Sequence, residues 1–535
     1  MPEKKMPRAA RPEEVQISSW ELSALMQDAI DSNLEWHSVM VVRRGKVAFE
    51  TFRRPYSPNF PHVMFSVSKS VTSCAVGFAV EEGLLTVEDR VIDLVPELGE
   101  EGQDPNLDSL TVRHLLTMTA GKLVSPMADK AKKRWLKDYA DGKWSYAPGE
   151  GWNYSNEGPY ILCVILKNLT GMGVVDYLMP RLFGPLGIPR PFWENDGNGV
   201  EAGGWGLYLT TESFAKIMTC YAQKGVFEGR QIIPAAWVEA SGSPLVMNYD
   251  HRTDEHGGNG YGYCFWVNSI PGSYRADGVF SQMGVIFPQY DACVMTTGGE
   301  VFTRSTLDCL FRHLPQLFES EEALPEGEAI PALPDYPVLA EAPRSAAMEE
   351  KLEGRTALFP NTMQQLPKMF GFPVSVMPVA VFFMSADKAG GIDKVRMRFQ
   401  EHTMKFSWNE GAERNTVLCG MDGAARLCKI TLGGVDFTVS CSAAWEGTPD
   451  APGGEKLHIW IRPLNSVAER RLTFTFRGRQ VRMQPRTVPS LSTLAEYAAP
   501  FAASMIPNPA LGQIISNSMG SIISAAEPTH FGYLK

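Results

Sequence analysis

The sequence lacks the short motifs that would place a protein directly in several large classes. Its nine cysteines include no Cys-x-x-Cys pair and its nine histidines no His-Glu-x-x-His, so no zinc site is expected. No Gly-x-Ser-x-Gly segment occurs, which argues against an α/β-hydrolase. The N-terminus, MPEKKMPRAARPEE, is charged and has no apolar core of a secretory signal. We therefore expect a cytoplasmic protein with reduced thiols.

An excess of basic charge is also missing. The 535 residues include 60 acidic and 50 basic side chains, for a formal net charge of −10, which gives no support for a nucleic-acid partner. A hydrophobic content of 44% is typical of globular proteins. The chain is too long for one hydrophobic core, so two or three domains are expected.

Long uninterrupted apolar runs are lacking too. The most apolar stretch, MFGFPVSVMPVAVFFMSA, covers residues 369–386 and is about long enough to cross a bilayer. Pro373 and Pro378 interrupt it, so it reads as buried strand and loop, and no membrane segment is expected.

The first 318 residues are expected to have strands at both ends and helices between them. Apolar β-type segments occur at residues 38–42 and 46–52, and again at 261–267, 273–277, 281–287 and 292–298. Helical patterns cover residues 13–33, 66–82, much of 85–220 and 304–317. This order predicts an α+β fold, with one antiparallel sheet closed by the two ends of the region, flanking helices and a helical insertion.

The composition changes after residue 318. Residues 319–345 are acidic and rich in proline and are expected to be a linker. Beyond them apolar residues alternate with polar ones; Val395, Met397 and Phe399 are an example. This period of two predicts half-buried antiparallel strands over residues 346–485. Residues 489–526 look helical, so residues 346–535 are expected to form a β domain with a helical tail.

A serine three residues before a lysine occurs three times. The pairs are Ser66–Lys69, Ser213–Lys216 and Ser385–Lys388. Ser213 follows a threonine suited to capping a helix, and Lys216 is expected to be solvated. Ser385 is expected in a turn. Only the first pair begins a helix of small and apolar residues, MFSVSKSVTSC at positions 64–74.

This first pair has the residues of an activated nucleophile. A serine hydroxyl needs a base within hydrogen-bond reach. Ser66 and Lys69 would lie one turn apart on the same helix face, and the apolar surroundings would lower the pKa of Lys69. A second reading stays open here, in which Ser66 caps the helix and Lys69 is exposed.

Four segments resemble the serine β-lactamase-related hydrolases, a family that includes class C β-lactamases, DD-peptidases, some esterases and 6-aminohexanoate-dimer hydrolases. They are FSVSKSVTSCAVGFAVEEGLLTVEDRVIDLVPEL from residue 65, LTVRHLLTMTAGK at 110–122, APGEGWNYSNEGPYIL at 147–162 and AGGWGLYLTTESFAKI at 202–217. They occur in the family's order. The resemblance implies a β-lactamase/transpeptidase-like domain over residues 1–318. Similar β appendages occur in the family, so a lipocalin-like domain is expected at the C-terminus.

The resemblance also assigns roles. Ser66 would be the nucleophile, and Lys69 would accept its proton or tune the neighbour that does. Tyr154 would be the second acid/base, with its pKa lowered by Lys69. Asn156 would hold Lys69 and a substrate carbonyl. No metal or organic cofactor is expected.

The third motif departs from the family's common form. YRADGVFSQMGVIFP, residues 274–288, has no Lys-Thr-Gly or His-x-Gly and resembles the Gly-x-x-Gly-Gln form of 6-aminohexanoate-dimer-hydrolase-like members. The resemblance places the oxyanion hole at the N–H groups of Ser66 and Val279 and substrate contacts at Gly278, Ser281 and Gln282. Arg275 is one candidate to hold a substrate carboxylate in place of that lysine or histidine, but it is expected instead to be exposed on its strand.

The expected function is therefore hydrolysis of a small ester, amide or short peptide through an acyl-enzyme. The absence of a lysine or histidine in the third motif favours an esterase over a β-lactamase or D-Ala-D-Ala carboxypeptidase. The alternative of another class is a non-catalytic, penicillin-binding-like protein that binds a peptide or other ligand, although such a protein has no need of Ser66, Lys69 and Tyr154 together.

Overall fold

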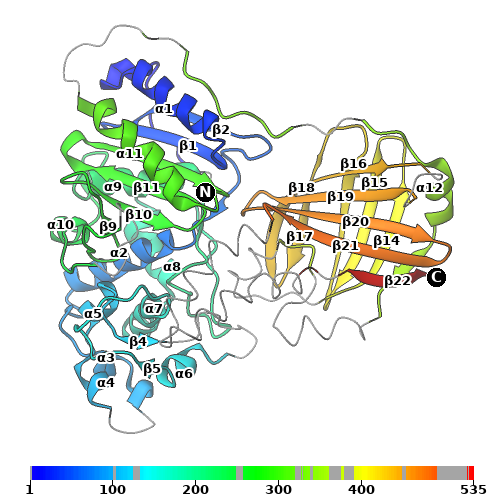
Figure 1. The fold of residues 1–535 in the computed structure, drawn as a ribbon. Coiled ribbons are helices and arrows are strands. Elements are labelled where there is room, and N and C mark those ends of the chain that lie inside the picture. The colour runs from blue at the N-terminus through cyan, green and yellow to red at the C-terminus, as the bar shows by residue number, and fades with distance from the viewer. Residues whose placement is uncertain are drawn as a thin grey trace. The chain divides into compact units, whose positions relative to one another are not determined.

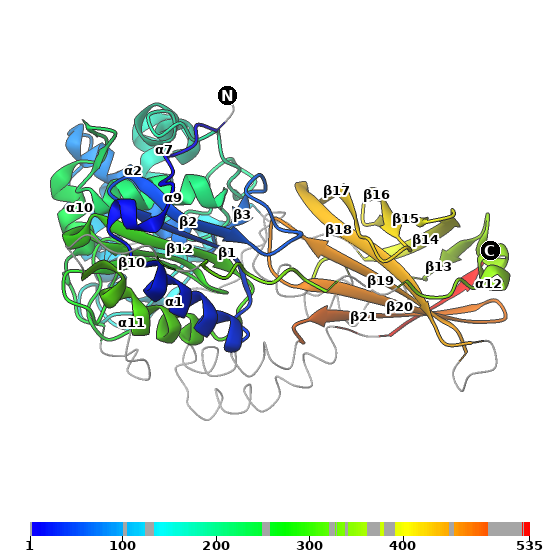
Figure 2. The ribbon, with the colours of Figure 1, turned by 90° about the horizontal axis from the view of Figure 1, so that it is seen from above.

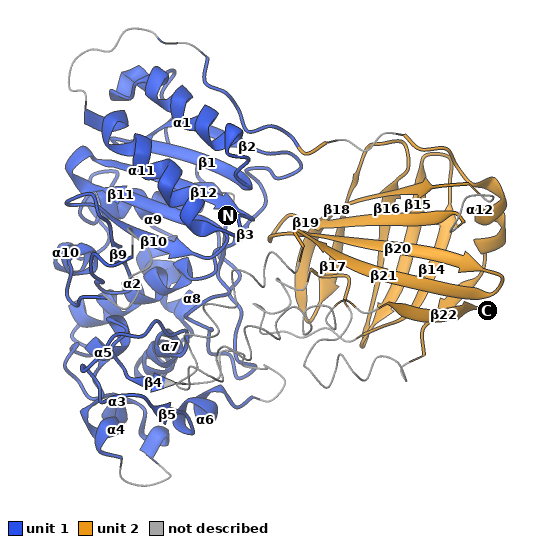
Figure 3. Ribbon diagram, in the orientation of Figure 1, with its two compact units in different colours: residues 1–335 blue, residues 336–535 orange. Residues whose placement is uncertain are grey.

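The structure is a computed structural model of the whole chain. It describes residues 3–99, 104–123, 133–248, 257–319, 327, 329–337, 341–360, 375–378, 391–448, 454–490, 527 and 529–535. The chain divides into two compact units, Met1–Asp335 and Tyr336–Lys535 (Figure 3). Of the apolar run at residues 369–386 only 375–378 are described, and of the expected helical tail at 489–526 only 489 and 490, so most of both expectations lies outside the described residues.

A six-stranded antiparallel sheet forms the centre of the first unit. Its strand order is β2-β1-β12-β11-β10-β9, so the two ends of the unit's sequence meet where β1 pairs with β12. The expected sheet is thus confirmed, because local hairpins and one long-range pairing bring its ends together. The strands are β1 (Trp36–Arg43), β2 (Lys46–Phe52), β9 (Trp266–Val267), β10 (Tyr274–Gly278), β11 (Gln282–Phe287) and β12 (Ala292–Gly298).

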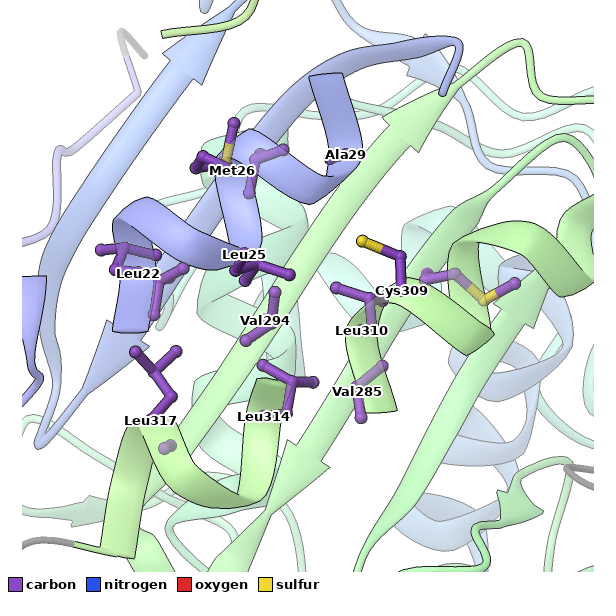
Figure 4. Packing of buried hydrophobic residues seen from close by; sticks show 14 of the residues in the cluster. Leu22, Leu25, Met26, Ala29, Val285, Val294, Cys309, Leu310, Leu314 and Leu317 are labelled. Atoms are coloured by element: carbon purple, nitrogen blue, oxygen red, sulfur yellow. The ribbon is translucent and has the colours of Figure 1, made fainter. Parts of the chain in front are cut away.

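Helices cover both faces of this sheet (Figures 1 and 2). Helices α1 (Ser19–Asp31) and α11 (Thr303–Glu319) pack on one face, and α2 (Val67–Glu81) and α9 (Thr211–Ala222) lie on the other. The first face is a continuous apolar layer in which leucines of α1 and α11 meet valines of β11 and β12 (Figure 4). Such burial stabilises the sheet by about 25 cal/mol per Å² of apolar surface removed from water.

The helical insertion lies between β2 and β9. Its helices are α3 (Val91–Leu94), α4 (Pro105–Ser109), α5 (Val112–Leu116), α6 (Trp135–Ala140), α7 (Glu157–Thr170), α8 (Val174–Leu178) and α10 (Ala235–Gly242), besides α2 and α9. Short helices η1 (Pro12–Val15), η2 (Pro96–Gly99), η4 (Met179–Phe183) and η6 (Pro288–Tyr290) also occur in the unit. Three two-stranded ladders complete it, β3–β6 (His62–Val63 and Tyr208–Leu209), β4–β5 (Lys122–Leu123 and Lys143–Trp144) and β7–β8 (Val226–Phe227 and Arg230–Gln231).

The described residues of the second unit form an antiparallel barrel of ten strands. Each strand pairs with the next along the chain from β13 to β16 and from β17 to β22, and β13 also pairs with β22. The two ends of this order are joined by a bridge between Gly420 and Ser442 and by the side chain of Asn415, whose Nδ2 donates to the carbonyl oxygen of Thr431 and whose Oδ1 accepts from the N–H of Thr431. The expected β domain is confirmed, with two strands more than the eight of a lipocalin.

The alternating pattern of the sequence explains this barrel. In β21 buried and exposed residues alternate along the whole strand, because successive side chains point to opposite faces. The elements are α12 (Ala346–Leu352), β13 (Thr356–Leu358), β14 (Ile392–Phe399), β15 (Thr403–Glu410), β16 (Glu413–Gly420), β17 (Arg426–Leu432), β18 (Val435–Glu446), β19 (Lys456–Pro463), β20 (Glu469–Arg477), β21 (Gln480–Val488) and β22 (His530–Leu534).

Within the described ranges, no single helix has both the length and the apolar character of a membrane span. The segments Glu157–Thr170 and Val174–Phe183, which meet at an angle of 70°, pass this test only when they are taken together as one bent pair.

Candidate active site

Ser66 lies in a constrained turn between β3 and α2. The preceding residue, Phe65, is buried and has a positive φ of 44°, a conformation that costs free energy for any residue other than glycine. The turn is held from two sides. The N–H of Met64 donates to the carbonyl of Leu207 at 2.8 Å, and the ring of Phe65 lies 5.4 Å from that of Phe280 at the tip of the β10–β11 hairpin. The position of the Ser66 hydroxyl is therefore fixed by the surrounding fold.

The contacts of Ser66 and Lys69 rule out the simple capping reading. Ser66 occupies the N-cap position of α2, yet its side chain caps no N–H of that helix among the described residues. Lys69 is buried, with 1% of its surface exposed, and its Nζ lies 3.0 Å from Oγ of Ser66. The serine and lysine therefore face each other inside the unit.

Two further acceptors orient the amine of Lys69. Its Nζ donates to Oδ1 of Asn156 at 2.6 Å and to the carbonyl oxygen of Gly204 at 2.8 Å. A neutral amine has two N–H bonds and one lone pair, so these two acceptors can hold both hydrogens and direct the lone pair at Ser66. An ammonium ion can instead donate to all three oxygens. The same geometry thus accommodates the amine before and after it takes up a proton.

Asn156 is available for this contact because its neighbour caps the helix. The N–H groups of Glu157 and Gly158, at the start of α7, both donate to Oγ of Ser155 at 3.1 Å. The amide of Asn156 is therefore not needed for capping and reaches Lys69. The sequence prediction that Asn156 holds Lys69 agrees with this contact.

Gly204 was not predicted from the sequence. A Cβ atom at this position would lie 2.5 Å from the carbonyl oxygen of Asn156, so only glycine allows the loop to come this close. Its neighbour Gly203 has a φ of 66° and accepts a hydrogen bond from Thr72 of α2 at 2.9 Å. The glycine pair in AGGWGLY was the signal that could have indicated a close backbone approach.

Burial sets the protonation of Lys69. Removal from water lowers the pKa of its amine from the ordinary 10.5 to about 7. Nearby acidic side chains, Glu157 and Asp277 among them, act in the opposite direction. A substantial fraction of Lys69 is therefore a neutral amine near pH 7, able to accept the proton of Ser66.

Tyr154 lies beside this pair. The Nζ of Lys69 is 4.6 Å from the centre of the Tyr154 ring. Burial raises the pKa of the phenol above its ordinary value, and a hydrogen bond with Ser66 opposes this rise. We expected Lys69 to lower this pKa, and that expectation is wrong because the loss of water around the phenolate outweighs nearby charge. Tyr154 therefore remains a neutral phenol near pH 7.

Aromatic rings hold Tyr154 in place. Its ring lies 5.5 Å from that of Trp266 and 6.1 Å from that of Trp152. Tyr261 completes the cluster, 5.3 Å from Trp266 and 5.5 Å from Trp152. Packed aromatic rings of this kind restrict rotation and keep a side chain in one orientation.

The end of β10 closely approaches the turn that carries Ser66. A Cβ atom on Gly278 would lie 2.5 Å from the carbonyl oxygen of Met64, so glycine is required where the strand meets the turn. Val279 follows Gly278 directly, and the pairing of its N–H with that of Ser66 in an oxyanion hole stays a prediction.

Ser281 and Gln282 face the interior. Both are completely buried. Oγ of Ser281 shares a hydrogen bond of 2.7 Å with Oγ1 of Thr306, and Nε2 of Gln282 donates to the carbonyl oxygens of Phe280 and Gly298, each at 2.9 Å. Their polar atoms therefore support the hairpin, which differs from the substrate contact expected for them.

Arg275 is buried, and the expectation of an exposed strand arginine is wrong. Only 2% of its surface is exposed. Its Nε donates to Oδ2 of Asp277 at 2.8 Å, its Nη1 donates to Oδ1 of Asn268 at 2.8 Å, and its guanidinium lies 5.5 Å from the centre of the Trp266 ring. A carboxylate and a π face together compensate the loss of hydration.

The second serine–lysine pair has other partners. Lys216 is buried with 1% exposed, so the expectation of a solvated lysine is wrong. Its Nζ donates to the carbonyl of Gly187 at 3.2 Å and lies 3.8 Å from Oε1 of Glu3, to which the hydroxyl of Ser213 also donates. Thr210 caps α9, as expected. The third pair, Ser385–Lys388, lies outside the described residues.

Comparison with known proteins agrees with this fold. Residues 32–298 match the Beta-lactamase family model. A 6-aminohexanoate-dimer hydrolase of Paenarthrobacter ureafaciens is 24% identical over 277 residues, which cover 48% of this chain and 70% of that protein. A penicillin-binding protein of Bacillus subtilis is 31% identical over 150 residues, covering 26% and 32%. The chain belongs to the serine β-lactamase-related family.

One solved structure and a further curated relative also resemble this chain. A penicillin-binding protein homologue from Caulobacter crescentus aligns with 55% of this chain and 97% of its own, at 16% identity and a TM-score of 0.45. A lovastatin esterase of Penicillium rubens, a curated relative, is 26% identical over 151 residues, covering 23% of this chain and 37% of its own. The match thus covers only about a third of the length of the Bacillus subtilis penicillin-binding protein and of the lovastatin esterase.

Proposed function

We propose that the first unit is a serine hydrolase that acts through an acyl-enzyme on a small ester or amide, with esters preferred. The observation that carries this proposal is the contact of 3.0 Å between Ser66 Oγ and the buried Lys69 amine, whose pKa is about 7. A paired hydroxyl and amine of this kind meets the requirement of a serine nucleophile for a nearby base.

Each residue has a defined part in the proposed reaction. Oγ of Ser66 attacks the carbonyl carbon of the substrate while its proton passes to Nζ of Lys69. The N–H groups of Ser66 and Val279 receive the developing negative charge on the carbonyl oxygen. Tyr154 donates its phenolic proton to the leaving group and regains one from the Lys69 ammonium. Water then attacks the acyl-enzyme by the same route in reverse, and the acid product leaves.

Lys69 rather than Tyr154 is the base in this scheme. Burial lowers the pKa of Lys69 to about 7 and raises that of Tyr154, so the amine and not the phenolate is the basic form present near neutral pH. The sequence left open whether Lys69 accepts the proton itself or tunes its neighbour, and the opposite directions of these two shifts favour direct acceptance.

The preference for esters rests on the third motif. Relatives that act on β-lactams or D-Ala-D-Ala hold a substrate carboxylate with a cationic or hydroxyl-rich strand motif, a contact worth about 1.5–3 kcal/mol. Here the corresponding stretch is Ala276, Asp277, Gly278 and Val279. Its single charged side chain is a carboxylate.

The test is a side-by-side measurement of kcat/KM for p-nitrophenyl acetate, p-nitrophenyl butyrate, nitrocefin and penicillin. We expect the short esters to be hydrolysed much faster than the two β-lactams. A kcat/KM for a β-lactam equal to or above that for the esters would overturn the ester preference and leave the assignment of Ser66 intact. No turnover of any substrate, together with no labelling by a fluorophosphonate, would instead favour a non-catalytic binding protein.

A further inference from the structure

The strand next to the nucleophile does contain a cation, but an acidic side chain on the same strand face covers it. Arg275 and Asp277 are two residues apart on β10, so their side chains point to the same side of the sheet. The Nε atom of Arg275 lies 2.8 Å from Oδ2 of Asp277. The guanidinium is almost completely buried, whereas 16% of the Asp277 side chain is exposed.

Several contacts place this pair at the wall of the site. Trp266 lies against both the guanidinium of Arg275, at 5.5 Å, and the ring of Tyr154, at 5.5 Å. Asp277 immediately precedes Gly278, where β10 touches the carbonyl of Met64. The negative charge of Asp277 also acts on the amine of Lys69 and on the phenol of Tyr154. The charge of Arg275 acts on that phenol as well, so both members of the pair lie in the electrostatic surroundings of the reacting groups, and Asp277 is the more exposed of the two.

We propose that the Arg275–Asp277 pair determines substrate class by keeping the only cation of the third motif neutralised, so that acyl groups bearing a carboxylate near the scissile bond are rejected. This inference rests on the proposed function and names the two residues that would set its substrate class. Arg275 is bound to Asp277 and Asn268 and cannot reach a substrate carboxylate without breaking these bonds. An incoming carboxylate would also meet Asp277 first, and two like charges repel each other.

A single substitution in this pair should therefore give the protein a new activity toward anionic substrates. In Asp277→Asn the carboxylate is replaced by a neutral amide of the same shape, which removes the ion pair that Asp277 forms with Arg275. A substrate carboxylate could then take the place of the Asp277 carboxylate as a charge-assisted hydrogen-bond acceptor for Arg275. The protein should therefore accept anionic substrates that it rejects in its natural form.

A matched pair of substrates measures this effect. p-Nitrophenyl butyrate and mono-p-nitrophenyl succinate share the leaving group and differ mainly in the carboxylate of the acyl chain. We expect Asp277→Asn to raise the ratio of kcat/KM for the anionic ester over the neutral ester by about tenfold or more. In the double variant Asp277→Asn with Arg275→Met, the gain should disappear because the freed cation is gone.

An exposed pair of the same kind supplies the control. Arg90 and Asp93 are bound to each other at 2.7 Å, with about half of each side chain exposed. Asp93→Asn also removes a carboxylate from an arginine and should leave the substrate ratio unchanged. A ratio that stays within about twofold of the natural protein in Asp277→Asn, while neutral ester is still hydrolysed, would overturn the proposal.

A second measurement needs no variant of the pair. An alkylboronic acid, which bonds to a serine hydroxyl, and the same acid with a terminal carboxylate are compared as inhibitors of the natural protein. Weaker inhibition by the charged acid, by about tenfold or more, supports the proposal, and equal inhibition by both overturns it. If neither acid inhibits and neither ester is hydrolysed, the proposed function fails, and this inference fails with it.

Discussion

Helices α2 and α9 of the first unit carry the same short pattern, a serine followed three residues later by a lysine, and both lysines are buried. In α2 the lysine faces the hydroxyl of its serine and two neutral oxygens. In α9 the lysine faces the carboxylate of Glu3. The spacing and the burial are alike, and the partners differ.

This difference explains why equal spacing leads to unequal chemistry. Burial lowers the pKa of both lysines, and at Lys216 the carboxylate of Glu3, 3.8 Å away, opposes this fall. The amine of Lys216 thus faces a carboxylate and not a serine hydroxyl. Ser213 is also committed, because its hydroxyl donates to Glu3 and its N–H donates to Thr210. The α9 pair therefore stabilises the N-terminal segment, and the α2 pair has the properties of a nucleophile with its base.

Removing each of the two serines in turn should have the largest effect on turnover and tests which pair is catalytic. Ser66→Ala should lower ester hydrolysis by at least about a thousandfold, because it deletes the hydroxyl that would form the acyl-enzyme. Ser213→Ala is the matched control and should keep the turnover of the natural protein. The reverse result would mean that the wrong helix has been chosen.

Removing the lysines should have the next largest effect. Lys69→Met keeps an unbranched apolar side chain and deletes the base, so kcat should fall by about 10²–10⁴-fold. Lys216→Met removes a lysine that is equally buried and should change melting temperature rather than kcat. If both variants lose turnover to the same degree at equal stability, the comparison between the two helices fails.

The substitution Tyr154→Phe tests the proposed proton donor, which has no counterpart in the comparison with α9. Tyr154→Phe keeps the ring, and with it the packing against Trp266, and deletes the proton donor. Turnover should fall by about a hundredfold with little change in melting temperature. The loss should be smaller for p-nitrophenyl esters than for alkyl esters, because p-nitrophenolate leaves without a proton. Unchanged turnover of alkyl esters would remove Tyr154 from the mechanism.

The pH dependence distinguishes the two lysines by their neighbours. Lys69 acts as a neutral base, so kcat/KM should rise with pH through an apparent pKa of about 7. The charge of Asp277 raises that pKa, so Asp277→Asn should move the rise in kcat/KM to lower pH, by about one unit or less. Glu3→Gln removes the carboxylate beside Lys216 and should leave this apparent pKa unchanged. An apparent pKa that moves with Glu3→Gln and not with Asp277→Asn would contradict these assignments.

Stability shows the smallest expected difference. Thr210 caps α9 by accepting the N–H of Ser213 at 3.0 Å, so Thr210→Ala should lower the free energy of unfolding by about 1 kcal/mol. Among the described residues Ser66 caps no N–H of α2, so Ser66→Ala should cost less than Thr210→Ala in urea denaturation. A larger cost for Ser66→Ala would show that its hydroxyl has a structural part after all.

The sequence predicted the sheet and the contact between Ser66 and Lys69 for a shared reason. Periodic apolar residues and the Ser66–Lys69 spacing are local patterns, and local patterns survive in a single sequence. The burial of Lys216 and of Arg275 was missed because each depends on a partner on another segment or strand position, namely Glu3 for the first and Asp277 and Trp266 for the second. Polar side chains are normally exposed, and only a tertiary partner reverses that expectation.

Gly204 and Gln282 illustrate the same limit within the site. The carbonyl of Gly204 orients Lys69, yet a backbone oxygen has no side-chain signature. Gln282 looked like a substrate contact because its motif lies beside the site, whereas its amide is used entirely to brace the hairpin. Distance along the chain gives neither the direction of a side chain nor the identity of a carbonyl partner.

The most direct test of the central claim is to locate the acylated residue. The natural protein is treated briefly with a fluorophosphonate, and peptide mass spectrometry identifies which serine carries the label. We predict labelling of Ser66 alone, lost in Ser66→Ala and strongly reduced in Lys69→Met, with Ser213 unmodified in every sample. A label on Ser213, or an unlabelled Ser66 in a sample that still hydrolyses p-nitrophenyl esters, would contradict the account.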